Sequence, residues 1–342
     1  MRKTLQKWSV LLATVFTIGI CISQLGKSHV YIATEGLIRT NITEYDHNSL
    51  ANFEPDKPST TRSMLGWMTN SKWRPGTKLD IYDFLINPVD TCKTETVNIT
   101  LLVLIKSAPG NGQRRDAARR TYIRGASDMN VSARMLFVVG HSESEDEREN
   151  LQKEAQAHGD ILGVSFLDHY YNLTIKLIMG FRWAAMFCSN SDFILSMDDD
   201  VMVDIVTLVN DLDALPVRNR SKFALGRRAE GYSPHRNSTS KWYIPEELYP
   251  NEFYPPFPYG NGYILSHDVV EKLCLMSKKS PARIPFDDVY CGILLDKLGI
   301  TILNRKDWFR NRHPQKRYRD YFKVELTGKR MDSAWKMFKR DI

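Results

Sequence analysis

The sequence predicts an α/β protein in which helices cover both faces of a mostly parallel β-sheet. Short apolar or alternating runs of strand length recur from about Cys92 onward, and helical stretches lie between several of them. The chain of 342 residues is 42% hydrophobic, which is enough to build a substantial core. The runs expected to form strands are Val97–Lys106, Arg134–Gly140, Ile161–Phe166, Asp192–Met197, Lys222–Gly226 and Gly262–Ser266.

The clearest expected helix covers Leu173–Cys188. Its apolar residues recur at spacings of three and four, which places them on one face of an α-helix. A helix between two expected strands favours an arrangement in which strands and helices alternate. The apolar face consists of Leu173, Leu177, Phe181, Ala184 and Cys188.

The N-terminal segment is expected to anchor the chain in a membrane. Trp8–Leu25 carries no charged residue, and a helix of this length would span about 27 Å, close to the thickness of a bilayer core. Basic residues precede it, so the N-terminus should remain cytoplasmic. A cleaved signal peptide is the alternative, but no small-x-small site follows Cys21. We expect a cytoplasmic tail over 1–7, a signal-anchor over 8–25, a lumenal stem over 26–90 and a folded domain over 91–342.

Sequons and cysteines agree with a lumenal domain. We expect glycosylation at Asn41, Asn130 and Asn237, whereas Asn98 leads into an expected strand and Asn172 begins an expected helix. In an oxidising lumen, four cysteines outside the membrane span permit two disulfides in three connectivities. These cysteines are Cys92, Cys188, Cys274 and Cys291.

The basic charge of the chain is concentrated at its C-terminal end. The formal net charge is +7, and Arg305–Ile342 holds 13 Lys and Arg residues against five acidic ones. A nucleic-acid partner is excluded by the expected position behind a membrane anchor. Three interpretations of this basic segment remain: it binds a phosphate-bearing ligand, it binds a lipid surface, or it is the solvated face of a helix.

Three consecutive aspartates, Asp198–Asp200, follow the apolar run Phe193–Met197. Their like charges repel one another, and a bound cation would relieve that repulsion. Mg²⁺ and Mn²⁺ prefer oxygen ligands and are held by one or two carboxylates plus substrate phosphates. The preceding strand would place the triplet at the carboxyl end of the sheet, where α/β proteins bind ligands. An acidic loop is the alternative, with Asp204 as the natural N-cap of the next helix.

A second acidic pair, Asp287 and Asp288, lies between Pro285 and the apolar run Ile293–Leu295. This position indicates a junction between a loop and a helix. A carboxylate there can act as a general base if partial burial raises its pKa toward working pH. A helix N-cap is the alternative.

Two further segments favour a nucleotide and a sugar as ligands. The turn Lys106–Gly112 leads into the basic run Arg114–Arg120, a place suited to phosphate, although such runs are often simply solvated. The segments Lys241–Pro245 and Tyr254–Tyr263 are rich in aromatic residues, proline and glycine. Aromatic faces pack against sugar rings, so a saccharide cleft is expected there; a proline-stiffened loop packed on the core is the alternative.

Together these segments resemble the inverting β-1,3-glycosyltransferases, which comprise β-1,3-galactosyltransferases and β-1,3-N-acetylglucosaminyltransferases. The resemblance runs from about Val97 to Ile302, with five motifs in the family's order. The first is Arg114–Tyr122, which resembles R-R-x-A-I-R-x-T-W. The others are Gly159–Leu162 with Asp168 and Asn172–Lys176, the triplet with Val201, Lys241–Tyr243 with the later Gly-x-Gly-Tyr-Ile-Leu-Ser, and Asp287–Gly292.

The resemblance implies a GT-A fold, a UDP-sugar donor, a glycan acceptor, Mn²⁺ or Mg²⁺, and a type II position in the Golgi membrane. It implies that Asp200 and Asp198 hold the metal ion and that Asp288 is the catalytic base. Donor contacts would come from Arg115, Arg119, Lys176 and Asp199, and sugar contacts from Trp242, Tyr243, Gly260, Asn261 and Gly262. Whether galactose, GlcNAc or GalNAc is transferred does not follow from these motifs.

The chain differs from the family pattern at some positions, and other protein classes have similar acidic motifs. Many family members place a metal-binding His where this chain has Val324 or Glu325, and His313 is the nearest substitute. A haloacid-dehalogenase-type hydrolase is disfavoured because Met202 replaces the expected Thr or Val. An EF-hand is excluded by ligand spacing. A catalytically silent homologue acting as a lumenal binding protein or chaperone is the stronger alternative.

Overall fold

The structure is a computed structural model that describes residues 81–93, 98–280, 284–305, 322–323 and 328–338. The expected cytoplasmic tail, the signal-anchor, most of the stem and Asn41 lie outside these residues, as do His313, Val324 and Glu325. Within the described ranges, no helix is both long and apolar enough to cross a membrane.

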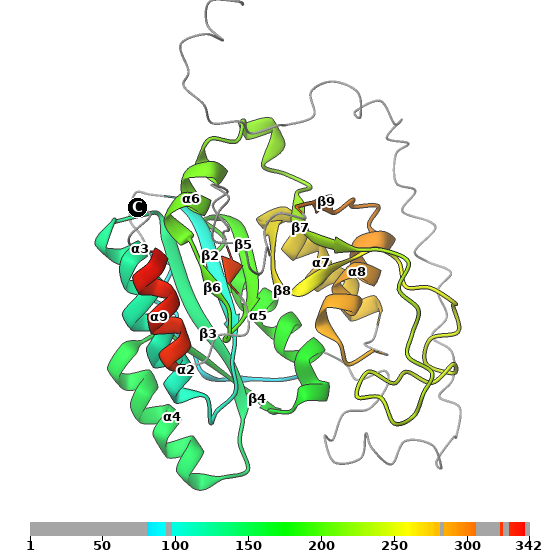
Figure 1. The fold of residues 1–342 in the computed structure, drawn as a ribbon, viewed down its shortest axis with the longest axis horizontal. Coiled ribbons are helices and arrows are strands. Elements are labelled where there is room, and N and C mark those ends of the chain that lie inside the picture. Colours follow the sequence, from blue (N-terminus) through cyan, green and yellow to red (C-terminus); the bar gives the residue numbers. More distant parts are fainter. Residues whose placement is uncertain (1–80, 94–97, 281–283, 306–321, 324–327, 339–342) are drawn as a thin grey trace, which may run out of the picture. The chain divides into compact units, whose positions relative to one another are not determined.

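A single mixed sheet forms the centre of the described chain (Figure 1). Its strand order is β1-β4-β3-β2-β5-β8-β7-β9. Strands β4, β3, β2 and β5 are parallel, whereas β8 runs antiparallel to both of its neighbours and β1 runs antiparallel to β4. The strands are β1 (Phe84–Ile86), β2 (Ile99–Lys106), β3 (Ala133–His141), β4 (Ile161–Leu167), β5 (Ser191–Asp198), β7 (Ala224–Ala229), β8 (Phe257–Ser266) and β9 (Leu303–Asn304). The α/β class is confirmed; the sheet is mixed, because β1 and β8 run antiparallel to their neighbours, whereas β9 pairs in parallel with β7.

Helices cover both faces of this sheet (Figure 1). Leu101, Val103 and Ile105 of β2 share one core cluster with residues of α2, α4, α6 and α9. A Cβ added to Gly180 of α5 would lie 3.3 Å from Leu104 and Val138, so α5 packs closely on the opposite face. The helices are α2 (Gly112–Ala118), α3 (Arg124–Asp128), α4 (Glu145–His158), α5 (Leu173–Phe187), α6 (Ile205–Asp213), α7 (His267–Lys279), α8 (Asp287–Lys297) and α9 (Gly328–Phe338).

Shorter elements complete the fold. A π-helical turn, η3, covers Arg119–Ile123, and the 3-10 turns η4 and η5 cover Tyr170–Asn172 and Val217–Asn219. Strands β6 (Met202–Val203) and β10 (Phe322–Lys323) form a small antiparallel sheet.

Helix α5 follows the expected segment but is buried more completely than predicted. Its buried residues include nearly every position from Thr174 to Ala184, on all sides of the helix. A helix that is hydrophobic all round lies inside a protein, and here α5 contacts the sheet, α7 and α8. The sequence predicted that one apolar face of this helix is buried, whereas nearly its whole circumference is buried.

One disulfide closes the end of α5. Cys92 is bonded to Cys188, and their Cα atoms are 5.2 Å apart. Cys274 and Cys291 are free thiols, so the second disulfide that the cysteine count permits is not formed. Of the expected glycosylation sites, Asn130 and Asn237 are exposed, whereas Asn172 is buried.

The register of the central strands sets the position of the polar residues. Lys106, the last residue of β2, pairs with Val138 of β3 and with Asp198 of β5. The carboxyl ends of these parallel strands therefore meet at one edge of the sheet, where ligands bind in open α/β folds. The turn after β2 and the aspartate triplet lie side by side at this edge.

The aromatic segment before Tyr263 is not a loop, as the sequence suggested, but mostly strand β8. Phe257–Ser266 pairs with β5 on one side and β7 on the other, so Gly260, Asn261 and Gly262 belong to a central strand. The prolines are accommodated because the β7–β8 register is irregular between Gly226 and Arg228. A Cβ added to Gly292 of α8 would lie 2.3 Å from the Cβ of Phe257, so this glycine permits close packing of α8 on β8.

Candidate active site

The three aspartates of the triplet face different surroundings. The side chains of Asp198 and Asp200 are 40% and 33% exposed, whereas that of Asp199 is 7% exposed. The role of N-cap belongs to Asp204, whose carboxylate accepts a hydrogen bond from the backbone N–H of Thr207 at 3.0 Å. Asp198 and Asp200 therefore present carboxylate oxygens at the edge of the sheet.

Asp199 fastens the turn after β2 to the triplet. It accepts hydrogen bonds from Ser107 Oγ at 2.7 Å, Asn111 Nδ2 at 2.8 Å and Arg114 Nη1 at 2.8 Å. Arg114 Nη1 also lies 3.9 Å from Asp200 Oδ2. These charge-assisted bonds fix the turn beside the open carboxylates.

Arg115 and Arg119 are engaged in internal ion pairs. The guanidinium of Arg115 is 1% exposed and binds both carboxylate oxygens of Glu154, at 2.8 and 2.7 Å. Its remaining donors reach Ser107 Oγ and carbonyls of the same turn. Arg119 forms a two-point pair with Asp160, with both distances 2.7 Å. In this structure Arg115 supports the turn, and Arg119 pairs with Asp160 and with Glu154.

Lys176 supports the same turn from α5. Its ammonium donates to the carbonyl of Ser107 and lies 2.8 Å from Asp168 Oδ2. Asp168 in turn accepts a hydrogen bond from the backbone N–H of Gly140 at 2.7 Å. Of the residues expected to contact the donor, Arg115, Lys176 and Asp199 therefore bond to the turn with their polar groups. Arg114, at 33% exposed, is a more accessible cation beside the triplet.

The triplet fits a hard divalent cation bound jointly with phosphate oxygens. Asp198 and Asp200 supply the oxygen ligands that Mg²⁺ and Mn²⁺ prefer. Among the described residues, no three His, Cys, Asp or Glu side chains gather as a metal site. One or two carboxylates are the usual protein contribution when a substrate diphosphate supplies the remaining oxygens, so the two exposed aspartates suffice.

Lys106 connects the triplet to the second acidic pair. Its buried ammonium lies 3.1 Å from Asp198 Oδ1 and also donates to Asp287 Oδ2. Asp287 is the first residue of α8, and the N-cap position belongs to Phe286, so the helix-cap interpretation of the pair is wrong. The two acidic motifs, far apart in the sequence, form one cluster.

Asp288 has the properties of a general base. Burial and, after it, the neighbouring charge of Asp287 raise its pKa to about 7 against the opposing effect of Lys106. Its side chain packs against Gly260 of β8, where an added Cβ would lie 3.4 Å from Asp288 Oδ2. A carboxyl group with a pKa near neutrality is suited to accept a proton at working pH.

Two groups of aromatic side chains lie in the neighbourhood of Asp288. In the first, Trp242 Nε1 donates to the hydroxyl of Tyr170 at 3.1 Å, and the Lys241 ammonium lies 4.4 Å from the Trp242 ring centroid. In the second, Tyr259 is hydrogen-bonded to Tyr232. Burial raises the pKa of Tyr170 and of Tyr259, and the charge of Asp288 adds to both shifts, so both hydroxyls lie near this carboxylate.

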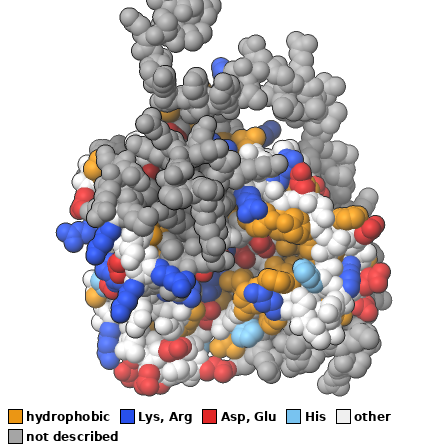
Figure 2. All heavy atoms as spheres, in the orientation of Figure 1, with side chains coloured by type: hydrophobic (Ala, Val, Ile, Leu, Met, Phe, Trp, Pro, Cys, Tyr) orange, Lys and Arg blue, Asp and Glu red, His pale blue; other side chains and the backbone are white. Residues whose placement is uncertain are grey.

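The predicted sugar-binding residues lie on β8 and in the segment around Trp242. Trp242 is exposed, Tyr243 is half-buried beside it, and Asn261 is half-buried on β8. Figure 2 shows acidic side chains near the middle of one face of the molecule, bordered by hydrophobic and basic side chains. This surrounding suits a sugar, which presents both C–H faces and hydroxyl groups.

The sequence profile of the galactosyltransferase family matches residues 113–306, more than half of the chain. The chain belongs to this galactosyltransferase family. The matched segment contains both acidic motifs and the aromatic residues around Asp288, while Lys106 lies just before it. The family resemblance expected from the order of motifs is confirmed.

Individual relatives of this galactosyltransferase-family chain agree with the match. The Xenopus laevis protein "Lactosylceramide 1,3-N-acetyl-beta-D-glucosaminyltransferase A" is 35% identical over 229 residues, which cover 64% of this chain and 59% of the relative. Human "Beta-1,3-galactosyltransferase 2" is 35% identical over 222 residues, or 64% of this chain and 52% of the relative. The chain thus spans little more than half the length of these curated relatives. A solved structure of the bifunctional glycosyltransferase WbbM overlaps 64% of the chain at 12% identity, with a TM-score of 0.36.

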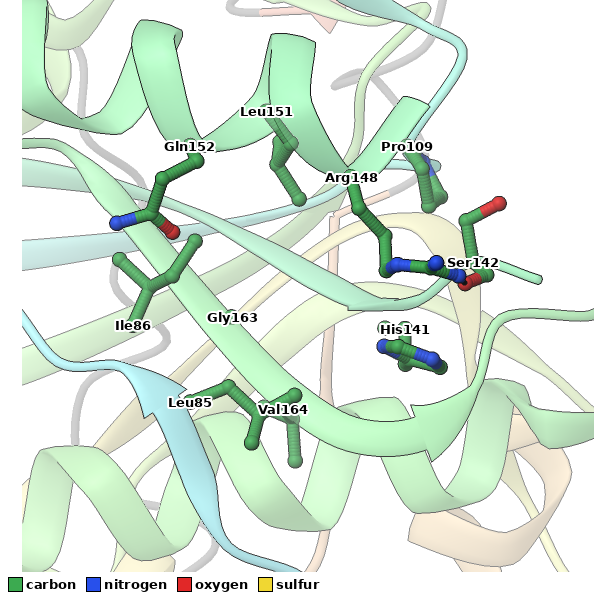
Figure 3. Close-up of a pocket in the computed structure, with 11 residues that line it drawn as sticks. Leu85, Ile86, Pro109, His141, Ser142, Arg148, Leu151, Gln152, Gly163 and Val164 are labelled. Carbon is green, nitrogen blue, oxygen red and sulfur yellow. Dashed lines mark hydrogen bonds between the residues drawn. The ribbon is translucent and has the colours of Figure 1, made fainter. Parts of the chain in front are cut away.

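A hollow beside the turn adds a further feature to the galactosyltransferase-family domain (Figure 3). Arg148 extends from α4 toward Ser142, and its Nη1 donates to the Ser142 carbonyl at 2.9 Å. Arg148, His141 and Ser142 lie at one end of the hollow, and Gln152 lies beside Ile86 at the other. Its lining includes Leu85, Ile86, Pro109, His141, Ser142, Arg148, Leu151, Gln152 and Val164.

Sequence reasoning gave no role to Tyr170, and it included Lys106 and Arg114 only within a turn and a basic run suited to phosphate. Lys106 ends an expected strand, and three further expected strands separate it from the triplet, so nothing local indicated that its partner would be Asp287. Arg114 was part of a recognised motif, but only burial distinguishes it from Arg115. A lysine that ends an otherwise apolar strand was the available signal for Lys106.

Proposed function

We propose that this chain is an inverting β-1,3-hexosyltransferase with a GT-A fold. It would transfer galactose, or alternatively GlcNAc or GalNAc, from a UDP-sugar to the 3-hydroxyl of a glycan acceptor on a protein or lipid. The observation that carries this proposal is the single cluster formed by the two acidic motifs. One motif presents carboxylate oxygens, and the other presents Asp288 with a pKa of about 7. The printed names of the relatives support galactose and GlcNAc as donor sugars.

Asp198 and Asp200 would hold the divalent ion together with the diphosphate of the donor. When bound, Mn²⁺ or Mg²⁺ offsets the negative charge that develops on the departing UDP. Arg114 lies beside Asp200 and can contribute a positive charge toward the same phosphates. The hollow in Figure 3 borders the turn after β2, and we assign the nucleoside part of the donor to its end at Arg148.

Asp288 would accept the proton of the acceptor 3-hydroxyl. As that oxygen bonds to the anomeric carbon, the bond from this carbon to the UDP oxygen breaks, and UDP departs with the bonding electrons. A single displacement from the opposite face converts an α-linked donor into a β-1,3 product. A base held at the reacting oxygen typically contributes about 10²- to 10⁴-fold to the rate.

The aromatic side chains around Asp288 would hold the two sugars. Trp242 and Tyr170 offer ring faces to a sugar, and β8 approaches Asp288 through Gly260 without a side chain between them. The glycine permits this close approach of the backbone to the base. The apolar N-terminal segment supports a type II position in the Golgi membrane, with this site in the lumen.

The proposal is tested by measuring UDP release from UDP-galactose, UDP-GlcNAc and UDP-GalNAc with a panel of glycan acceptors. Each reaction is run with Mn²⁺, with Mg²⁺ and with EDTA. We expect acceptor-dependent release that EDTA abolishes and that Asp288→Asn lowers by about 10²- to 10⁴-fold. Asp296→Asn, an exposed position on the same helix, is the matched control.

Two results would contradict the proposal in different ways. Release that is unchanged by EDTA would remove the metal role of Asp198 and Asp200. A folded protein that binds UDP but transfers no sugar to any acceptor would instead support a silent homologue acting as a binding protein or chaperone.

A further inference from the structure

Lys106 makes contacts that match the full hydrogen-bonding capacity of its ammonium group. A lysine ammonium has three N–H donors. Nζ lies 3.1 Å from Asp198 Oδ1, contacts Asp287 Oδ2, and lies 3.4 Å from the carbonyl oxygen of Gly260. The side chain is only 3% exposed. One cation at the end of β2 therefore joins β5, α8 and β8.

The burial of this cation makes its contacts energetically necessary. A charged group removed from water is tolerated only when opposite charges and hydrogen bonds replace its hydration. Asp287 is equally buried, with 6% of its side chain exposed, and Lys106 is its ion-pair partner. Removal of Lys106 would leave a buried carboxylate without that partner, directly next to Asp288 in the chain.

We propose that Lys106 is a positioning residue that holds Asp198 and Asp287 in one charge cluster and thereby fixes Asp288 beside Gly260, facing the donor-binding edge. This inference rests on the proposed function, because it assigns Lys106 a role in joining the donor and acceptor halves of that site. Lys106 acts through Asp287 and Asp198, and it does not itself touch the reacting atoms.

The electrostatics of the cluster agree with this role. The ammonium of Lys106 lies within ion-pairing distance of two carboxylates, those of Asp198 and Asp287, and these opposite charges replace its hydration. The positive charge of Lys106 also lowers the pKa of Asp288, in opposition to burial and to Asp287. The titratable or charged groups that face Asp288 from the surrounding elements are Asp287, Lys106, Asp198, Tyr170, Tyr254, Tyr259 and Cys291.

The test compares pH profiles of Lys106→Met, Lys106→Arg, Lys106→Met/Asp287→Asn and the wild type, all as full chains. Loss of a positive charge within a few ångströms shifts a carboxyl pKa by one unit or more. We expect Lys106→Met to raise the pH at which the transfer rate is half-maximal on the acid side by about one unit. The double variant should have a midpoint close to that of the wild type, because the two deleted charges act on Asp288 with opposite signs. Lys106→Arg should leave this midpoint unchanged.

A second readout does not depend on turnover. Carbodiimide labelling of Asp288, followed by mass spectrometry across pH, reports the protonated fraction of this carboxyl group. Its midpoint should move up in Lys106→Met, and it should stay unchanged in Lys153→Met, an exposed lysine on α4. Melting temperatures show whether each variant is folded. Lys106→Met leaves the buried carboxylate of Asp287 without its ion-pair partner and should be destabilised, whereas the double variant also removes that carboxylate charge.

The possible failures are distinguishable. If the wild type transfers no sugar but the labelling midpoint moves as expected, the proposed function fails and the positioning role stands. If Lys106→Met is folded and both its rate midpoint and its labelling midpoint match the wild type, the positioning role is overturned while the transferase proposal is unaffected.

Discussion

Gly260 of β8 lies against Asp288 of α8: a Cβ added to the glycine would lie 3.4 Å from Asp288 Oδ2 and 3.6 Å from its Cγ. The carbonyl oxygen of the same glycine lies 3.4 Å from Lys106 Nζ. Because residue 260 has no side chain, the backbone of β8 packs directly against the carboxyl group of Asp288, while its carbonyl oxygen joins the charge cluster. Gly260 contributes to the site by its size and its carbonyl group.

Replacing Gly260 by a larger residue should lower the rate of sugar transfer, and a larger side chain should lower it more. An alanine Cβ would meet Asp288 at an ordinary contact distance, so Gly260→Ala should cost less than about tenfold. Gly260→Val adds two further methyl groups that displace the carboxylate, and a displacement of about 1 Å can lower a rate by 10²-fold. Steady-state rates of both variants, with melting temperatures as the folding control, check this order. Equal rates for the two variants would show that the space in front of Asp288 is not used.

The transfer rate should depend on pH through Asp288. Burial, with the charge of Asp287, raises the pKa of Asp288 to about 7, and a base works in its deprotonated form. Activity should therefore rise as pH increases through about 7 and level off above it. Below that value the rate should fall about tenfold per pH unit as the carboxyl group is protonated. Rates at saturating donor from pH 5 to 9 measure this limb; a flat profile would contradict the assignment of Asp288 as base.

The strands and acidic motifs could be predicted because their signals are local. The expected runs Ile161–Phe166 and Asp192–Met197 correspond closely to β4 and β5, since buried parallel strands are continuously apolar. The start of β8 was missed because Pro256, Pro258 and Gly260 favour a loop in isolation. Pairing on both sides overrides that local preference.

The roles of the basic residues could not be predicted in the same way. Arg114 and Arg115 are adjacent in the chain and chemically identical, yet one is 33% exposed and the other 1%. Helical rotation turns one toward Asp199 and the other toward Glu154, which lies on α4. Only the packing of α4 against the turn decides which arginine remains accessible, and the partner of Lys106 is likewise fixed by the packing of α8 on β8.

Asp199 and Asp200 should respond differently to the same substitution. Asp199 accepts three hydrogen bonds from the turn, so Asp199→Asn should lower the free energy of unfolding by about 2–3 kcal/mol. Asp200 is more exposed, so Asp200→Asn should leave stability nearly unchanged but weaken the activation of transfer by Mn²⁺ at least tenfold. Denaturant unfolding and Mn²⁺ titrations of activity separate the two effects. Similar losses of stability in both variants would contradict this division of roles.

Arg115→Met should destabilise the fold rather than weaken donor binding directly. The guanidinium of Arg115 is 1% exposed and makes a two-point ion pair with Glu154, and removing one member of such a buried pair typically costs about 3–5 kcal/mol. Arg124→Met is the matched control, because Arg124 is 74% exposed and its pairing with Asp128 should contribute little. Thermal unfolding of the two variants, with UDP affinity measured by calorimetry below both transitions, checks the prediction. A variant at Arg115 that keeps wild-type stability but loses UDP binding would instead make this arginine a donor contact, and the turn after β2 would then have to open to expose it.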